Sequence, residues 1–379
     1  MFNTKTPIGH FLYICTYLKQ THMNTVISDL IITKTTASRI SQVDFENIPF
    51  GRIFSDHMLV MDYIDGHWQT PEIKPFAPIP MHPAASALHY GQSFFEGMKA
   101  YKHEDGKIVL FRPSLNASRF NHSAERLCMP TINEDRFVSL ISELVRIDAD
   151  WVPGSENSAL YIRPFMYATD EYIGVKASDN YRFVVFTCPV NAYYSEHLRL
   201  KIEEYYTRAA EGGVGNAKAA GNYAASLYPA KLGRDKGFHQ LLWTDGKTHQ
   251  YIEESGTMNI VFMIDNVLIS PSEDSDTILR GTTKRTVFDL AKLWGIKTEE
   301  RRVRVDEVID AIRTHRLQEC FGAGTAATIA QVDVLGFRDE ILQLPNIENR
   351  TFSKRLQEEI DGIKYGNIED EMRWLYTIN

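Results

Sequence analysis

The chain has 379 residues, more than one hydrophobic core usually holds, so two domains are expected. Hydrophobic residues make up 44% and charged residues 24%, which indicates a soluble globular protein and excludes wholesale disorder. The 41 basic and 49 acidic residues give a formal net charge of -8. This balance argues against a nucleic-acid partner, because phosphates are bound by clustered Lys and Arg.

The cysteines and histidines indicate a reduced compartment and no metal. Four cysteines lie far apart without a CxxC pair, so we expect free thiols in a cytoplasmic protein: Cys15, Cys128, Cys188 and Cys320. The twelve histidines form no HExxH or His-x-His pair, so no bound metal is expected.

The first 22 residues need separate treatment. The segment PIGHFLYICTYL is apolar, but it has little basic sequence before it, no small-residue cleavage site and too few residues to span a bilayer. A second methionine follows at Met23. We therefore expect residues 1–22 to be dispensable within an N-terminal extension of residues 1–45. No later segment reaches membrane-spanning length, so we expect no membrane partner.

Residues 46–190 are expected to form a smaller α/β domain. Residues 57–75 predict a β-hairpin with an Asp-Gly turn. Asn116 is a suitable N-cap for a first helix and Asn133 for a second, and apolar residues follow each at helical spacing. Two β-rich runs complete the domain, at residues 159–165 and 181–190.

Residues 191–200 are expected to be a linker, and residues 201–379 a larger domain. Strand patterns separated by short turns recur in the larger domain, at residues 198–206, 238–244, 249–254, 258–264 and 267–271. Helices are expected after Gly281, after the cap Asp306, and around Leu356, Ile360 and Ile363. The predicted fold class is therefore mixed α/β with largely antiparallel or mixed sheets, and not a doubly wound sheet.

The stretch EGGVGNAKAAGNYAAS, residues 211–226, places Lys218 among several glycines. A Walker phosphate loop fails because Ala219 follows the lysine and no glycine precedes it, and a dinucleotide fingerprint lacks its third glycine. A third interpretation is a lysine presented into a pocket, where lost solvation lowers its pKa and frees the amine for Schiff-base chemistry. Because a lone lysine in such a loop is usually a surface charge, this interpretation needs support from elsewhere.

Three further loops in the same half supply that support. YIEESGTMN (251–259) and FGAGTAAT (321–328) each end a strand with Gly and Thr, whose N–H groups and hydroxyls can hold phosphate or carboxylate oxygens. LRGTTKR (279–285) begins a helix with Thr282 and Thr283, and a helix N-terminus favours an anion. Each loop alone is typical of an ordinary turn or cap. Together with the lysine loop they indicate a site for a phosphorylated cofactor.

Several strings in this sequence resemble the branched-chain aminotransferases, pyridoxal-phosphate enzymes of fold type IV. They occur in the family's order over about residues 46–370: LHYGQSFFEGMKAYK, LFRPSLNASR, LYIRPF, GGVGNAK..GNY, E.GTMN and FGAGTA. The resemblance implies a two-domain fold type IV architecture in which the larger domain binds pyridoxal 5'-phosphate. It also implies a cytoplasmic homodimer.

Carried over by position, the resemblance implies that Lys218 carries the cofactor as a Schiff base and moves the α-proton. Glu254 would pair with the pyridine nitrogen, with Glu253 as its rival. Because neighbouring strand residues point to opposite faces, only one of the two can do so. Tyr223 would bond the phenolic oxygen of the ring. The other implied cofactor contacts, mainly with the phosphate, are Arg119, Thr257, Thr282, Thr283 and Thr325.

The implied reaction is a ping-pong transamination of leucine, isoleucine and valine with 2-oxoglutarate, which gives branched 2-oxo acids and L-glutamate. The implied pocket residues from this chain are Tyr90, Phe95, Tyr161 and Arg163, and Val175 would reach over from a partner subunit. The turn at Thr325 and Ala326 would take the α-carboxylate. Aromatic walls suit a branched aliphatic side chain, although the same aromatics could be plain core.

Two alternatives stay open from the residues alone. One is another fold type IV enzyme, such as a D-amino-acid aminotransferase or an aminodeoxychorismate lyase. The other is a non-catalytic nucleotide- or anion-binding module built on the glycine-rich loop. In the animal branched-chain enzymes a CxxC pair follows GTA; Ala327 and Ala330 stand here, so thiol regulation is not expected at that loop.

Overall fold

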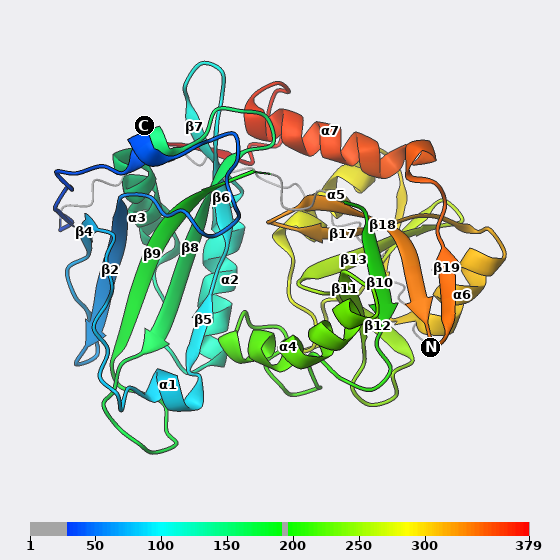
Figure 1. Ribbon diagram of the computed structural model, residues 1–379, viewed down its shortest axis with the longest axis horizontal. Helices are drawn as coiled ribbons and strands as arrows, with labels where there is room; N and C mark the ends of the chain where they lie inside the picture. The colour runs from blue at the N-terminus through cyan, green and yellow to red at the C-terminus, as the bar shows by residue number, and fades with distance from the viewer. Residues whose placement is uncertain (1–28, 192–195, 379) are drawn as a thin grey trace, which may run out of the picture.

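The computed structural model describes residues 29–191 and 196–378. The expected leader (1–22) and Met23 lie outside these residues, as does part of the expected linker. Figure 1 shows two halves side by side, each built on its own β-sheet with helices packed against it. The mixed α/β fold class is confirmed.

Within the described part of the chain, the first half contains a ten-stranded sheet of mainly antiparallel pairs. Its path runs β1-β4-β2-β9-β8-β6-β7-β20, with β3 beside β2 and β5 beside β8. The strands are β1 (Ile31–Ile32), β2 (His57–Ile64), β3 (His67–Trp68), β4 (Glu72–Pro75), β5 (Ser93–Phe95), β6 (Met98–Lys102), β7 (Ile108–Phe111), β8 (Ala159–Ala168), β9 (Tyr181–Val190) and β20 (Leu375–Ile378). The expected hairpin and both expected β-rich runs are present in this sheet.

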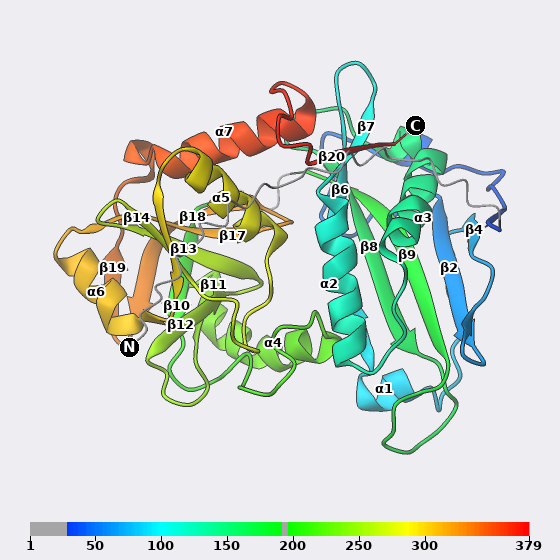
Figure 2. The ribbon, with the colours of Figure 1, turned by 180° about the vertical axis from the view of Figure 1, so that it is seen from behind.

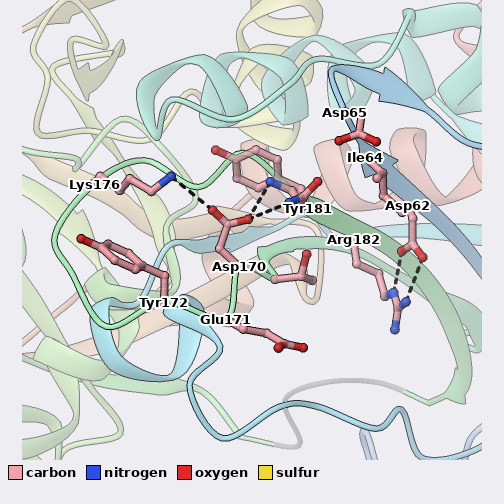
Figure 3. Close-up of a pocket in the computed structure, with 11 residues that line it drawn as sticks. Asp62, Ile64, Asp65, Asp170, Glu171, Tyr172, Lys176, Tyr181 and Arg182 are labelled. Carbon is pink, nitrogen blue, oxygen red and sulfur yellow. Dashed lines mark hydrogen bonds and ion pairs between the residues drawn. The ribbon is translucent and has the colours of Figure 1, made fainter.

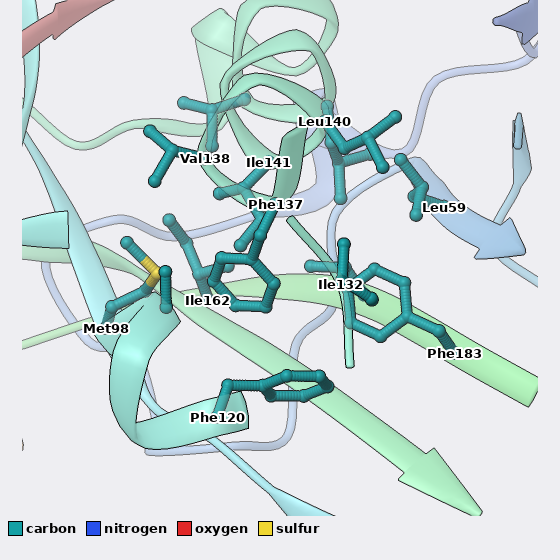
Figure 4. Packing of buried hydrophobic residues seen from close by; sticks show 14 of the residues in the cluster. Leu59, Met98, Phe120, Ile132, Phe137, Val138, Leu140, Ile141, Ile162 and Phe183 are labelled. Atoms are coloured by element: carbon teal, nitrogen blue, oxygen red, sulfur yellow. The ribbon is translucent and has the colours of Figure 1, made fainter. Parts of the chain in front are cut away.

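Two helices, α2 (Pro113–Arg126) and α3 (Glu134–Ile147), cover one face of the first sheet (Figure 2). Figure 4 shows Phe120 of α2, Phe137 of α3 and Phe183 of β9 packed together in the core between these layers. The Phe120 and Phe137 rings lie 4.9 Å apart between centroids. Each of these side chains is at most 1% exposed, so apolar burial holds the helices on the sheet. The short α1 (Ser86–Tyr90) and the 3-10 turns Ile40–Gln42 and Ala149–Trp151 complete this half.

The start of α2 differs from the expectation. The helix begins at Pro113, whose fixed φ suits the first helical position, and Arg112 before it has a left-handed φ of 49°. Asn116 therefore lies inside the helix and is not its cap. It is buried, and its amide donates to the Gly97 carbonyl at 3.3 Å. The expected cap of α3 is confirmed, because the Asn133 side chain accepts from the Arg136 N–H at 3.0 Å.

The second half also has ten described strands, in the order β15-β14-β13-β17-β18-β10-β11-β12-β16, with β19 beside β18. They are β10 (Leu198–Ile202), β11 (Gln240–Thr244), β12 (Tyr251–Ser255), β13 (Met258–Ile264), β14 (Val267–Pro271), β15 (Lys297–Arg301), β16 (Val303–Arg304), β17 (Leu317–Gly324), β18 (Thr328–Phe337) and β19 (Glu340–Gln343). The helices are α4 (Ala220–Asp235), α5 (Thr282–Leu293), α6 (Val305–Arg313) and α7 (Phe352–Tyr365), with a 3-10 turn at Ile347–Asn349.

Three local expectations for this half need correction. Helix α4 was not expected: only Asn222, Pro229 and Gly233 of it are buried, so it carries almost no apolar periodicity. The short turn expected between β11 and β12, at Asp245-Gly246, is a longer loop of residues 245–250. Asp245 organises this loop and accepts from the Tyr251 N–H at 2.8 Å. Helix α6 begins at Val305, so the expected cap Asp306 stands in its first turn.

The C-terminal strand crosses between the halves. Strand β20 pairs antiparallel with β7 of the first sheet. The last residues of the expected larger domain, 201–379, therefore belong to the first half. Conversely, β10 begins at Leu198, inside the segment expected to be linker. Helix α7 lies along the second half, and its Tyr365 ring meets Tyr101 of β6 at 5.4 Å between centroids (Figure 1). The two halves are thus joined by packing as well as by the chain.

The structure bears on the expected free thiols, membrane spans and metal sites only within residues 29–191 and 196–378. The cysteines in this range, Cys128, Cys188 and Cys320, are free. No helix there is both long and apolar enough to cross a membrane. No cluster of three His, Cys, Asp or Glu side chains there could hold a metal ion.

Candidate active site

A cleft of about 390 Å³ lies between the two halves and collects most of the predicted site residues. One wall comes from the first half, from strands β5 and β8, helix α2, and the residues Phe50 and Gly97. The other wall comes from the glycine-rich loop, α4, β12, β13, the start of α5 and the β17–β18 turn. The residues predicted from sequence that line it are Phe95, Arg119, Tyr161, Arg163, Lys218, Tyr223, Glu254, Thr257, Thr282, Thr283, Thr325 and Ala326.

Lys218 stands at the end of the glycine-rich loop, just before α4. Its backbone N–H donates to Ser123 Oγ of α2 at 2.9 Å, which fixes the loop against the first half. Its Nζ lies 3.1 Å from the hydroxyl of Tyr223 and 5.0 Å from the centre of the Phe95 ring. The loop is closely packed, since a Cβ on Gly215 would lie 2.7 Å from Thr277 Cα. The amine is therefore presented into the cleft, as the third interpretation of the loop predicted.

Glu254 reaches the cleft from β12 and is 4% exposed. Its Oε2 lies 2.8 Å from Arg208 Nε, and its Oε1 accepts from the Leu279 N–H at 2.8 Å. Burial raises the pKa of Glu254, against the opposing charge of Arg208. Glu253 lines a different hollow on the other side of the strand. The predicted alternation of the two acids is therefore present, with Glu254 on the cleft side.

An anion-binding corner forms where Arg119 meets the start of α5. Arg119 donates from Nε and Nη2 to Glu96 at 2.7 and 2.6 Å, and from Nη1 to the Arg280 carbonyl at 2.9 Å. Although burial alone would raise the pKa of Glu96, the charge and hydrogen bonds of Arg119 lower it. Arg119 is thus held at the cleft by an acid that the sequence did not single out.

The first turn of α5 completes this corner. Its N-cap residue is Gly281, so no capping side chain stands over Thr282 and Thr283. A Cβ on Gly281 would collide with Oδ1 of Asn259, and only glycine fits there. The first N–H groups of a helix lack partners within the helix and favour anions. Because Glu96 balances the charge of Arg119, the first N–H groups of α5 are the main feature that favours an anion in this corner.

Aromatic side chains form the opposite end of the cleft. Arg163 packs over the Phe95 ring, with its guanidinium carbon 4.4 Å from the ring centre, and donates to the Tyr161 hydroxyl at 3.0 Å. Phe50 meets Tyr161 edge-on at 5.6 Å between centroids. This end is apolar along its walls and has one guanidinium within it, which suits side chains of either character.

Comparison with known proteins decides the family. The family model described as amino-transferase class IV matches residues 93–335. The chain is 44% identical over 343 residues to branched-chain-amino-acid aminotransferase 2 of Bacillus subtilis, covering 89% of this chain and 94% of that one. The chain belongs to the branched-chain-amino-acid aminotransferases of class IV.

Solved structures of the family share this fold. The Escherichia coli branched-chain amino acid aminotransferase matches with a TM-score of 0.69 and 25% identity, covering 86% of this chain and 99% of that one. The Thermobaculum terrenum enzyme, solved in its PLP form, matches with a TM-score of 0.67 and 21% identity over 86% of this chain and 98% of that one. At 21% identity the second likeness concerns the fold alone.

Two expected substrate residues of this aminotransferase lie away from the cleft of their own chain. Tyr90 ends α1 and is 42% exposed, and it does not line the cleft. The family resemblance placed it in the pocket, but it is the last residue of α1, which ends at the left-handed Gly91. Val175 is 90% exposed on the loop between β8 and β9, as a residue expected to serve a partner subunit must be.

The loop that carries Val175 is well anchored at its base. Figure 3 shows Asp170 bonded to neighbouring groups of this loop, and it accepts from the Asp179 and Asn180 N–H groups at 3.0 Å each. Arg182 nearby is paired with Asp62 at 2.6 Å. Asp170 is paired with Lys176 and Asp62 with Arg182, so these side chains serve to hold the loop in place.

Sequence reasoning missed Phe50 and Leu279, which line the cleft, and Glu96 and Arg208, which pair with the cleft residues Arg119 and Glu254. A buried carboxylate needs a counter-charge, so an arginine partner for Glu254 was foreseeable as a type, although its position was not. Phe50 and Leu279 contribute through a ring edge and a backbone N–H. Such contributions carry no sequence motif.

Proposed function

We propose that the protein transfers amino groups between the branched-chain amino acids leucine, isoleucine and valine and 2-oxoglutarate, using pyridoxal 5'-phosphate. The observation that carries the proposal is the facing pair in one cleft: the amine of Lys218 and the buried carboxylate of Glu254, beside a corner built for an anion. The names of the relatives support the substrate class.

The side chains present fit the proposed cofactor. The phosphate would lie at the start of α5, held by its N–H groups, Thr282, Thr283 and Arg119, with Thr325 nearby. Glu254 would face the ring nitrogen, and Tyr223 the phenolic oxygen. The buried Glu254 supports this assignment because a cation opposite would lower its raised pKa and stabilise both charges. When bound, the cofactor supplies an aldehyde that condenses with amines and a ring that accepts electron density from Cα.

Lys218 would act as acid and base through its Nζ. The Tyr223 hydroxyl, 3.1 Å away, orients this amine, and the aromatic face of Phe95 limits where it can move. An amine so placed can take a proton from one carbon and return it to another, which is the proton transfer that transamination requires. Arg208 would help Glu254 keep its negative charge. That charge would favour a protonated ring nitrogen, which makes the cofactor ring a better electron acceptor.

The aromatic end of the cleft would take the side chain of the substrate. Phe95, Tyr161 and Phe50 would bury a branched aliphatic chain, and Arg163 would pair with the distal carboxylate when glutamate binds instead. The Thr325–Ala326 turn would take the α-carboxylate of both substrates. One cleft would thus serve the two half-reactions in turn, as a ping-pong exchange needs.

The proposed assembly is a cytoplasmic homodimer in which the β8–β9 loop reaches the partner's cleft. Its apolar tip supports this, since Tyr172, Ile173 and Val175 are 51%, 69% and 90% exposed on an anchored loop. Exposed apolar side chains gathered at one place favour a protein contact. Helix α1 lies beside this loop, so Tyr90 at the end of α1 would join Val175 in the contact with the partner subunit (Figure 1).

The test is an amino-donor panel with 2-oxoglutarate as acceptor. Purified protein supplied with pyridoxal phosphate should be yellow and should form glutamate from leucine, isoleucine and valine, with little from aspartate or phenylalanine. Omission of the cofactor after dialysis against a competing amine is the matched control. Turnover of D-alanine without turnover of any branched L-amino acid would assign the protein to another class IV activity.

A further inference from the structure

The β17–β18 turn lies between two lysines from other elements: Lys364, which is buried, and Lys99, which is partly exposed. Lys99 of β6 donates from Nζ to the Ala326 carbonyl at 2.7 Å. Lys364 of α7 donates from Nζ to Thr328 Oγ1 at 2.7 Å. On its other side the turn faces the cleft through Thr325 and Ala326. Lys99 and Lys364 therefore bind one side of the turn, and the other side, at Thr325 and Ala326, lines the cleft.

The conformation of this turn needs such outside support. Thr328 has a φ of 58°, in the left-handed region that a β-branched residue rarely adopts. Gly324 at the start of the turn packs on Met258, since a Cβ there would lie 2.8 Å from Met258 Cγ. A conformation of this kind persists only where its surroundings hold it. Lys99 and Lys364 are the polar contacts that do so.

Lys99 differs from Lys364 in its charge balance. Lys364 has Asp361 at 3.3 Å, one turn away on α7. Among the described residues, no carboxylate forms an ion pair with Lys99. Its titratable neighbours are Tyr161, its strand partner on β8, Tyr101, which lines the same cavity, and Lys364 and Asp361 of α7. The ammonium of Lys99 thus lies behind the cleft without an acid of its own.

A small cavity separates this lysine from the cleft. It has a volume of about 30 Å³ and is lined by Lys99 and Lys364 together with Thr283 and Thr325, which also line the cleft. The ammonium is therefore separated from the anion-binding side of the site by little more than one turn of chain. In a poorly solvated region, charges at such short range interact strongly.

We propose that Lys99 is a positioning residue for the substrate carboxylate: it fixes the Ala326 carbonyl, and with it the Thr325–Ala326 turn, and its charge favours an anion on the cleft side of that turn. The inference rests on the proposed function, because it takes this turn as the carboxylate site. Since the peptide unit is planar, fixing the Ala326 carbonyl also fixes the direction of the next N–H. Removing Lys99 would loosen the turn and remove the charge together.

The protonation of Lys99 gives the inference a signature that a purely structural residue lacks. Burial and, to a smaller extent, the nearby charge of Lys364 lower the pKa of Lys99 to about 7, against the opposing charge of Asp361. A bound carboxylate would raise the pKa of Lys99 again. The phosphate proposed at Thr283 and Thr325, across the same cavity, would also raise the pKa of Lys99 above its value in the cofactor-free protein. By linkage, carboxylate binding takes up a proton, so the affinity should fall as the pH rises through the pKa of Lys99.

The experiment measures the Kd of 4-methylvalerate, an unreactive carboxylate without an amine, for the cofactor-loaded protein at pH 6.5 and 8.5. In the wild type the Kd should rise roughly five- to twentyfold over this range. In Lys99→Arg, whose guanidinium stays charged, the rise should be much smaller. The two proteins differ only at residue 99, so the difference between the two profiles belongs to that residue.

A charge-removing variant and a matched control complete the design. Lys99→Met should raise the Kd about tenfold or more at pH 6.5, which is about 1.4 kcal/mol, while cofactor content and Tm stay near those of Lys102→Met. Lys102 lies on the same strand three residues on, so it faces the other side of the sheet. Equal Kd values for the Lys99→Met and Lys102→Met variants would overturn the proposal.

The comparison of wild type with Lys99→Arg decides the matter even if Lys99→Met fails to fold. Identical pH profiles for those two proteins would overturn the role of Lys99 while leaving the transamination itself intact. A wild-type protein that bound neither pyridoxal phosphate nor the acid would instead overturn the proposed function, and this inference with it.

Discussion

Strand β12 separates two hollows, and its neighbouring acids face one each. Glu254 faces the cleft with Lys218 and Arg119, whereas Glu253 faces a hollow of about 650 Å³ with Asp245 and Thr277. Both side chains are at least nine-tenths buried, at 4% and 7% exposure. The two residues are thus alike in type and burial, and they differ in what lies opposite them.

That difference decides what each carboxylate can do. Glu254 has Arg208 at 2.8 Å and an N–H donor, so it can stay ionised when a cationic ring nitrogen approaches. Within the described part of the chain, Glu253 Oε2 has no hydrogen-bond partner. Burial raises the pKa of Glu253 to about 7. A buried acid becomes useful for catalysis when its surroundings supply a counter-charge, and burial alone only makes it easier to protonate.

The largest effect expected on the cleft side comes from Lys218→Ala. The variant should still bind pyridoxal phosphate non-covalently through Arg119 and the start of α5, but turnover should fall on the order of 10⁴-fold, because the group that moves the proton is gone. Turnover is measured as glutamate formed from leucine, and the covalent link by borohydride reduction. Near-normal turnover, or a cofactor still fixed by borohydride, would remove Lys218 from this role.

The direct test of the two sides is a pair of matched substitutions. Glu254→Gln should lose about 1.5–3 kcal/mol from the charge-assisted hydrogen bond, with kcat at least tenfold lower. Glu253→Gln, one residue away, should leave kcat within about twofold because it does not face the cleft. If Glu253→Gln were the impaired variant, the assignment of faces would be inverted. If neither variant were impaired, the proposed pairing of Glu254 with the ring nitrogen would be wrong.

A smaller effect should follow from Arg208→Met, which removes the counter-charge and leaves Glu254 in place. Without Arg208 the pKa of Glu254 should rise further, so the acid would be protonated at higher pH and kcat should fall about tenfold at neutral pH. The loss should be partly recovered at higher pH, where Glu254 ionises again. Because Arg208 also donates to the Gly215 and Thr277 carbonyls, Arg208→Lys is the control that keeps the charge. A uniform loss at all pH values would indicate a structural role only.

The chemistry of the site was more predictable from sequence than its supports. The glycine-rich loop singled out Lys218, and the family resemblance assigned Lys218 and Glu254 their roles. Strand alternation, a local pattern, predicted that only one of Glu253 and Glu254 could face the cleft. Helix α4 was missed because its exposed surface gives no periodic apolar face. Arg208 and Phe50 act through contacts that only the folded chain brings together. Strand β20 joins the first sheet by a pairing across more than half of the chain, which no local pattern could indicate.

The smallest effect belongs to the other side of the strand and concerns stability. The pKa of Glu253 is raised by burial from its usual 4.5 to about 7 in the folded protein. The unfolded chain therefore loses this proton first, and the folded state is destabilised progressively as the pH rises from about 4.5 to 7. One pKa unit corresponds to about 1.4 kcal/mol, so the full cost is up to about 3 kcal/mol above pH 7.

Glu253→Gln removes the titration and should raise the Tm at pH 8 by a few degrees relative to wild type, with little difference at pH 5. Glu254→Gln should show no such gain, because Arg208 would be left buried without its acid. A Glu253→Gln variant that is equally destabilised at both pH values would mean that the carboxylate makes a contact which an amide cannot replace, and the contrast between the two acids would then rest on their facing alone.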